Sequence, residues 1–396
     1  MNTLQEKIKK LAEEFHSENI GHRRHLHAYP EPSFEEFETS KYIQKQLDQL
    51  GIPFQIMADT GVIGLIKGHK PSDEVIALRA DMDALPIHEK NEVEYVSKNI
   101  GYMHACGHDA HTASLLGAAK ILNSLKAEFG GTIKLIFQPG EEKVPGGASL
   151  LIAEGVLENP KPEAVLGQHV APQIPVGKVG FRPGKYMASA DELFVYVHGK
   201  GGHGAMPDLN IDPVLIASHI IVALQQIISR NANPKMPSVL SFGRVIAEGA
   251  TNVIPDQVYI EGTFRTLDET WRASALGKMK KMAELMAEGM GGSCDFQIKK
   301  GFPALVNDEA LTHRLKKEAQ NYLGEENVID LDLWMASEDF AFYSQLAPSC
   351  FYRLGTRNDD KGITSSVHTP TFNIDEEALK IGPGLMSYLA LKQLGN

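Results

Sequence analysis

Apolar and charged residues alternate at helical spacing near the start of the chain, with apolar positions at Leu4, Ile8, Leu11 and Phe15. This pattern predicts an amphipathic helix, which gives way to a His-rich stretch over residues 21–30. A second amphipathic helix is predicted over residues 34–50, where Gly51 ends it.

Beyond this point, short apolar runs typical of buried strands alternate with helical segments. The predicted strands cover residues 62–67, 75–78, 132–137 and 164–167. A long helix with a face of small residues is predicted over residues 110–129. Such alternation favours a largely parallel or mixed sheet covered by helices, which is the α/β class.

The pattern changes near Tyr186. The elements predicted after it are strand 191–198, helix 211–229, strands 238–245 and 257–265, helix 269–290 and strand 294–299. This βαββαβ order is the split βαβ, or ferredoxin-like, arrangement. We therefore predict an inserted α+β domain at residues 187–300, within an α/β domain formed by residues 1–186 and 301–396.

Composition agrees with this division and excludes some partners. A chain of 396 residues is longer than one hydrophobic core usually serves. With 43% hydrophobic and 22% charged residues it is typical of a globular protein. No stretch approaches the run of about 18 apolar residues that spans a bilayer, so we expect no membrane segment. The formal charge of −11 disfavours nucleic acid as a partner.

Two features predict a cytoplasmic protein. The first 20 residues mix charged with apolar positions, whereas a secretory signal needs an uninterrupted apolar stretch. The three cysteines, Cys106, Cys294 and Cys350, are an odd number in a large chain, which argues against a disulfide framework.

Reactive side chains follow three of the predicted strands. Strand 75–78 leads into Asp81 and Asp83, strand 132–137 into Glu141 and Glu142, and strand 164–167 into His169. Side chains that act on ligands gather just beyond the carboxyl ends of strands in such sheets. We therefore expect these groups to converge.

A fourth segment precedes the long predicted helix and adds Cys106 and His108. Residues two apart in an extended loop point the same way, so both side chains could bind one metal ion. Thiolate, imidazole and carboxylate are ligands that zinc and neighbouring first-row metals accept. Four other histidines, His25, His27, His104 and His111, are interpreted as structural or as supporting a ligand.

Each of these signals has a simpler interpretation. A lone Cys-x-His is weak, because buried cysteine is often only a small apolar filler. Paired glutamates usually lie on a solvated surface. Here Glu141 and Glu142 follow an apolar strand and Pro-Gly, where a surface helix is improbable. Buried carboxylates such as Asp81 and Asp83 need a partner or a metal.

Several short motifs run in order along nearly the whole chain. They are RRHLH (23–27) with Pro30 and Glu31, LRADMDALP (78–86), MHACGHDAHT (103–112), QPGEE (138–142), GKGGHGAMPD (199–208), NVIPD (252–256) and SEDF (337–340). Together they resemble the M20 metallopeptidases, in particular the amidohydrolase branch with bacterial N-acyl amino acid amidohydrolases, hippurate hydrolases and plant auxin-conjugate hydrolases.

The resemblance implies a dinuclear metal centre and assigns its residues. Cys106 matches the ligand that bridges both metals, and the remaining matching ligands are His108, Glu142, His169 and His368. Glu141 matches the general base. Asp83 matches a carboxylate that orients a metal-bound group. The metals implied are two divalent ions per chain, with Zn, Mn, Co and Ni all compatible with these ligands.

The inserted segment resembles the family's lid, which also makes the dimer contact. His203 resembles a residue that reaches into the partner subunit's active site, while Asn252 and Arg265 resemble binders of the substrate carboxylate. The residues alone would favour simpler interpretations, namely a flexible glycine-flanked turn for His203 and a strand-surface charge for Arg265.

The expected function is hydrolysis of the amide bond of an N-acyl amino acid, with Glu141 taking a proton from water and passing it to the leaving nitrogen. Two alternatives stay open. One is a dipeptidase or carboxypeptidase of the same family, acting on a short peptide. The other is an inactive homologue that binds peptide or metal, against which the presence of Glu141 and all five candidate ligands argues.

Overall fold

The computed structural model describes residues 3–395, which form two compact units. The first unit runs to Gly184 and takes in Val306–Asp332 and the chain from Asp339 onward. The second unit consists of Lys185–Leu305 and Leu333–Glu338.

The first unit is built on a mixed sheet of eight strands, in the order β1-β2-β4-β3-β5-β16-β6-β15. The strands are β1 (Phe54–Met57), β2 (Gly61–Lys67), β3 (Lys70–Asp81), β4 (Gly130–Gln138), β5 (Ala164–Pro175), β6 (Val179–Phe181), β15 (Val328–Asp330) and β16 (Ser349–Arg357). The central strands β4, β3, β5 and β16 run parallel, while β1, β2 and β6 pair antiparallel with β2, β4 and β16. The α/β class predicted from the alternation of elements is confirmed.

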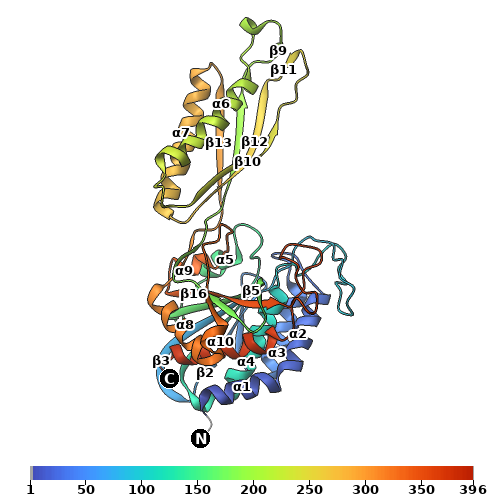
Figure 1. The fold of residues 1–396 in the computed structure, drawn as a ribbon, viewed down its shortest axis with the longest axis vertical. Helices are drawn as coiled ribbons and strands as arrows, with labels where there is room; N and C mark the ends of the chain where they lie inside the picture. Colours follow the sequence, from blue (N-terminus) through green and yellow to red (C-terminus); the bar gives the residue numbers. More distant parts are fainter. Residues whose placement is uncertain (1–2, 396) are drawn as a thin grey trace. The chain divides into compact units, whose positions relative to one another are not determined.

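Helices pack on this sheet through alternate strand residues. On β3, Ile76, Leu78 and Ala80 belong to one apolar core, which they share with five of the helices. Those helices are α1 (Leu4–Glu14), α3 (Phe37–Gln49), α4 (His108–Ser124), α8 (Glu309–Leu323) and α10 (Ala378–Gln393), and the unit also contains α2 (His16–Ala28), α5 (Gly147–Ala153) and α9 (Ala341–Ser344). Figure 1 shows α4 and α10 beside the sheet, with α1 and α2 next to them.

The His-rich stretch at residues 21–30 was predicted to follow the end of the N-terminal helix. In the structure it is itself largely helical, because α2 continues through it to Ala28. Arg23 and His27 are one helical turn apart and both bind the buried carboxylate of Asp109 on α4. Residues four apart share a helix face. The tertiary ion pairs therefore favour a helix where Gly21 alone would weaken it.

The second unit contains an antiparallel sheet in the order β10-β12-β8-β13. Its elements are β8 (Asp191–His198), α6 (Pro213–Gln226), β10 (Ser238–Ile246), β12 (Gln257–Thr266), α7 (Glu269–Gly289) and β13 (Ser293–Lys300), with a separate pair β9 (Gly202–His203) and β11 (Val253–Ile254). Figure 1 shows α6 and α7 side by side against one face of this sheet. The βαββαβ order and its strand arrangement are those of the split βαβ fold. Two short strands, β7 (Gly184–Met187) and β14 (Leu305–Asn307), occupy the chain positions where one unit passes into the other.

Helix α6 bears on the expectation that no segment of the chain crosses a membrane. The helical segment Pro213–Asn231 is long and apolar enough to cross a membrane by length and composition alone, with a mean hydropathy of 1.3. Apolar residues spread around a helix reach that value without forming an unbroken run. A single such helix is weak evidence, because core helices pass the same test, and Ile216, Ile220 and Leu224 are buried in the core of the second unit.

Candidate metal centre

Four loops meet at the carboxyl ends of the parallel strands of the first unit. Asp81 is the last residue of β3, and it pairs with Gln138, the last residue of β4. Two residues past β3 comes Asp83, and three residues past β4 comes Glu141. His169 lies inside β5, which pairs with the other side of β3. Parallel pairing in this register places the reactive side chains of three strands at one edge of the sheet.

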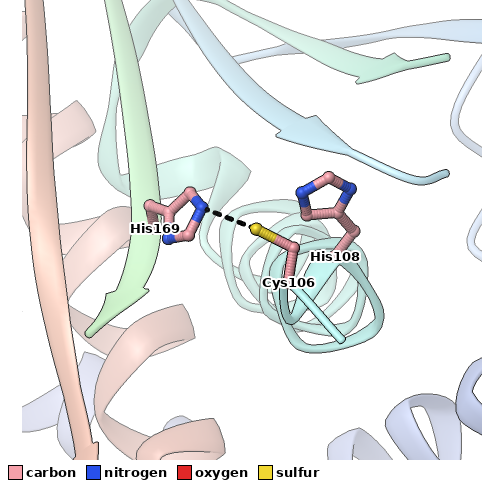
Figure 2. A group of neighbouring side chains, drawn as sticks. All are labelled: Cys106, His108 and His169. Carbon is pink, nitrogen blue, oxygen red and sulfur yellow. Dashed lines mark hydrogen bonds between the residues drawn. The ribbon is translucent and has the colours of Figure 1, made fainter. Parts of the chain in front are cut away.

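Cys106 and His108 reach the same edge from the start of α4. Gly107 between them adopts a left-handed conformation, with φ of +85°, and a Cβ atom there would come within 2.5 Å of Val170. Only glycine fits both requirements. Figure 2 shows the sulfur of Cys106 pointing toward the ring of His169 on β5, at 3.5 Å from Nε2.

His368 completes a group around the same sulfur. Its Nε2 lies 3.3 Å from Cys106 Sγ and 3.3 Å from Glu142 Oε1. Its backbone N–H donates to the carbonyl of Ala105 (2.7 Å), which ties this distant segment to the Cys106 loop.

Two overlapping sets of ligand atoms therefore share Cys106. One comprises Cys106, His108 and His169, and the other comprises Cys106, Glu142 and His368, with the atoms of each set within 4.8 Å of one another. In the described residues, His108 Nε2 and Glu142 Oε1 are buried without a hydrogen bond, although the latter lies 3.3 Å from His368. Buried polar atoms are normally satisfied. Two such atoms beside a thiol fit a pair of divalent cations.

The two buried histidines have their Nε2 atoms aimed at the centre, because their other nitrogens are already bonded. His108 Nδ1 donates to Asp83 Oδ1 (3.1 Å), and His169 Nδ1 donates to the carbonyl of Val170 (2.7 Å). Such bonds fix the tautomer and the ring orientation of a metal ligand. The Asp83 carboxylate thus lies where a ligand-orienting group is needed.

The pKa shifts of the cluster are compatible with side chains that bind a cation. The hydrogen bond with Cys106 and the ion pair with Glu142 raise the pKa of His368 to about 10, so its ring carries a positive charge at neutral pH. Burial, helped by the charge of Glu142, raises the pKa of Cys106. Burial lowers the pKa of His169 far enough to keep it neutral. A metal would take the place of the His368 and Cys106 protons.

A third cluster, Asp81 with His108 and His111, is not a cation site. His111 Nδ1 donates to Asp81 Oδ1 (2.5 Å), and its Nε2 accepts the N–H of Val170 (2.8 Å). Arg79 binds the other oxygen of Asp81 (2.6 Å). Both nitrogens of His111 are occupied, so it holds the backbone next to His169 rather than a metal.

Glu141 is 6% exposed and forms a close group with His108 and Glu142. One of its oxygens accepts the N–H of Asp339, at 3.4 Å. A carboxylate placed beside the ligand atoms in this way can exchange a proton with a water bound there.

The three remaining predicted site residues belong to the second unit. His203 is exposed on β9, and its neighbour Gly204 donates to the carbonyl of Asn252 (2.8 Å). Arg265 lies on β12, and its Nη1 donates a hydrogen bond to the backbone carbonyl of Met335 (3.1 Å).

Sequence reasoning missed several residues that support the centre. Glu36, fully buried, accepts the N–H of Gly140 at 2.7 Å, and Ser33 donates to Asp83 at 2.6 Å. Asp109, beside His108, binds Arg23 and His27, whose four-residue spacing was a detectable signal. For Glu36 and Ser33 no signal was available, because their partners lie far away in sequence.

Comparison with known proteins shows the family of this chain. The model of peptidase family M20/M25/M40 matches residues 77–392, which is most of the chain. The chain belongs to this peptidase family. It is 40% identical over 382 residues to the N-acetylcysteine deacetylase of Bacillus subtilis, covering 95% of this chain and 97% of that protein.

Two further relatives span almost the full length. Thermostable carboxypeptidase 1 of Saccharolobus solfataricus is 37% identical over 393 residues, with 98% of each chain covered. The crystal structure of the YXEP protein of Bacillus subtilis, described as a dinuclear metal-binding peptidase of family M20, has 38% identity and a TM-score of 0.84 and covers 97% of this chain and 99% of that one. The M20 resemblance is confirmed, and the chain is a hydrolase that acts on amide or peptide bonds.

Proposed function

We propose that the protein hydrolyses the amide bond of N-acyl amino acids, using two divalent metal ions. Cys106, His108 and His169 would hold one ion, and Cys106, Glu142 and His368 the other. The observation that carries this proposal is the pair of ligand sets sharing one thiol, with Nε2 of His108 and Oε1 of Glu142 buried and lacking hydrogen bonds. The similarity to a deacetylase of an N-acyl amino acid supports the substrate class.

The chain's own residues would perform the proton transfers. Divalent ions bound here would supply water with a pKa lowered from about 15.7 to about 7, and would polarise the substrate carbonyl. Glu141 would accept the proton of the attacking water and deliver it to the leaving nitrogen. Asp83 would keep the Nδ1 proton on His108. Thiolate, imidazole and carboxylate ligands suit Zn, Mn, Co or Ni.

The second unit is proposed as a lid that also forms a homodimer. The outer face of α6 exposes Val214, Leu215 and Val222, and β10 is an edge strand that exposes Val239 and Val245. An exposed apolar helix face and an edge strand in one unit are suited to a second copy of the same unit. We propose that His203 of one chain serves the active site of the other.

Within the lid, Asn252 and Arg265 are proposed to bind the substrate carboxylate. A guanidinium offers the planar pair of donors that a carboxylate prefers. The three cysteines are free thiols, which supports the proposed cytoplasmic location.

A peptidase that acts on dipeptides or on peptide C-termini is the second candidate, favoured by the similarity to a carboxypeptidase. The two candidates share metals and base, so substrates must separate them. Metal content should be measured, and the protein reconstituted with each of the four metals should be assayed against N-acetyl and N-benzoyl amino acids and against dipeptides.

We expect two ions per chain and the highest kcat/KM on an N-acyl amino acid. Preference for dipeptides would select the peptidase instead, and a metal-free, inert protein would refute both. Glu141→Gln should keep both metals while losing about 100- to 10,000-fold in kcat. For the shared site, inactive His203→Ala mixed with Glu141→Gln should regain part of the activity, and confirmed mixed dimers without activity would refute it.

A further inference from the structure

The turn that carries Glu141 is fastened on both sides by buried carboxylates. Asp83 Oδ2 accepts the N–H of Glu142 at 2.9 Å. On the other side, Glu36 Oε1 accepts the N–H of Gly140 at 2.7 Å. The amides immediately before and after Glu141 are thus fixed by two different segments of the chain.

Glu36 is fully buried and has further partners. Its Oε1 also accepts the N–H of Phe34 (2.9 Å), and its Oε2 accepts the hydroxyl of Thr60 (2.9 Å). A buried carboxylate is costly unless it is hydrogen-bonded. Three donors bind the carboxylate of Glu36, so its position in the first unit is fixed.

The segment around Glu36 also packs tightly on the turn. Gly140 adopts φ of +58°, and a Cβ atom there would lie 2.2 Å from the ring of Phe34. Ser33 Oγ donates to Asp83 Oδ2 (2.6 Å), the same oxygen that accepts from Glu142. Residues 33–36 therefore connect the two carboxylates that hold the turn.

We propose that Glu36 is a positioning residue, which sets the reach of Glu141 by anchoring the amide of Gly140. The inference rests on the role of Glu141 in the proposed function. A general base must lie within hydrogen-bond reach of its proton, and a displacement of about 1 Å can cost about 100-fold in rate.

Substitutions can separate this role from simple structural support. Glu36→Ala removes the acceptor, and Glu36→Asp retracts the carboxylate by one methylene. Glu36→Gln keeps an oxygen toward Gly140 while its amide N–H can donate to Thr60. Burial and the charge of Asp83 raise the pKa of Glu36 to about 7, so a neutral side chain is compatible with this position near neutral pH. Thr60→Val is the matched control, because it removes a partner of Glu36 without touching Gly140.

The experiment measures two quantities in the full-length protein with its metals. One is kcat and KM on the best N-acyl amino acid. The other is hydrogen exchange of the backbone amides in residues 138–147, which needs no substrate. Metal content is checked for every variant.

Glu36→Ala and Glu36→Asp should lower kcat by about 10- to 100-fold with little change in KM. Exchange at Gly140 should accelerate at least about tenfold in both, as a lost hydrogen bond allows. Glu36→Gln and Thr60→Val should stay within about threefold of wild type in both measurements. If Glu36→Ala does not fold, Glu36→Asp decides.

Unchanged exchange at Gly140 in the Ala and Asp variants would overturn the inference, as would equal losses of kcat in Thr60→Val. Accelerated exchange with unaltered kcat would also overturn it, since the anchor would then not matter for the base. A wild-type protein without turnover would count against the proposed function, while the exchange measurement would still decide whether Glu36 anchors the turn.

Discussion

His111 offers a direct test of how the metal centre is supported. It joins the Asp81 carboxylate to the N–H of Val170, the residue after the candidate ligand His169, through bonds of 2.5 and 2.8 Å. Val170 in turn accepts from His169 Nδ1 at 2.7 Å. His111→Phe would keep the ring volume and remove both bonds.

The expected magnitudes follow from these contacts. A buried N–H left without a partner costs about 1–3 kcal/mol, and a hydrogen bond lost by a carboxylate costs about 1.5–3 kcal/mol. The first unit should therefore be destabilised by about 2.5–6 kcal/mol. Loss of a group that orients a ligand typically weakens metal affinity about 10- to 100-fold, which equals about 1.4–2.7 kcal/mol.

The assay is titration of metal-free protein with Zn²⁺ against a competing chelator, together with urea unfolding. Thr112→Val is the control, because Thr112 donates to the backbone carbonyl of Asp81 (2.8 Å), whereas the N–H of Val170 donates to His111. It should lose about 0.5–1.5 kcal/mol of stability and keep its metal affinity. Zn²⁺ affinity of His111→Phe within about threefold of wild type would refute the reasoning, since His169 would then not depend on this support.

Three further outcomes are expected. Arg79→Met should destabilise the first unit by about 3–5 kcal/mol in urea unfolding, because the buried carboxylates of Asp81 and Asp339 each lose a 2.6 Å partner; a loss under about 1 kcal/mol would contradict this. Val222→Asp, on the exposed face of α6, should convert the proposed dimer into monomers, as measured by light scattering, with metal content unchanged; an unaltered dimer would remove that face from the interface. Peroxide treatment of chelator-stripped protein should abolish reactivation by metal through oxidation of Cys106, and full reactivation would argue that Cys106 is no ligand. Burial raises the pKa of that thiol, so the thiol form predominates near neutral pH. Below the pKa, the thiolate fraction, and with it the rate at which peroxide abolishes reactivation, should grow about tenfold per pH unit.

Local patterns in the sequence were sufficient for the fold class and for most elements. Apolar periodicity and turn residues act over a few positions, so β8 has the predicted bounds and the βαββαβ order of the second unit was evident. Periodicity misjudged α2, because the partner of Arg23 and His27 lies more than 80 residues away on α4.

By itself, the sequence determined which residue types were available for metal chemistry and in which motifs they stood. It predicted an extended loop between Cys106 and His108, whereas the structure has a left-handed turn at Gly107 and begins α4 at His108. The resemblance implied that His368 joins Cys106, and the structure places its Nε2 3.3 Å from that sulfur. Only the tertiary structure decided that both nitrogens of His111 are occupied and that Glu36 holds the turn of Glu141. The physical reason is that hydrogen bonds and burial act through space, so residues far apart in the chain acquire their roles only when the sheet brings their loops together.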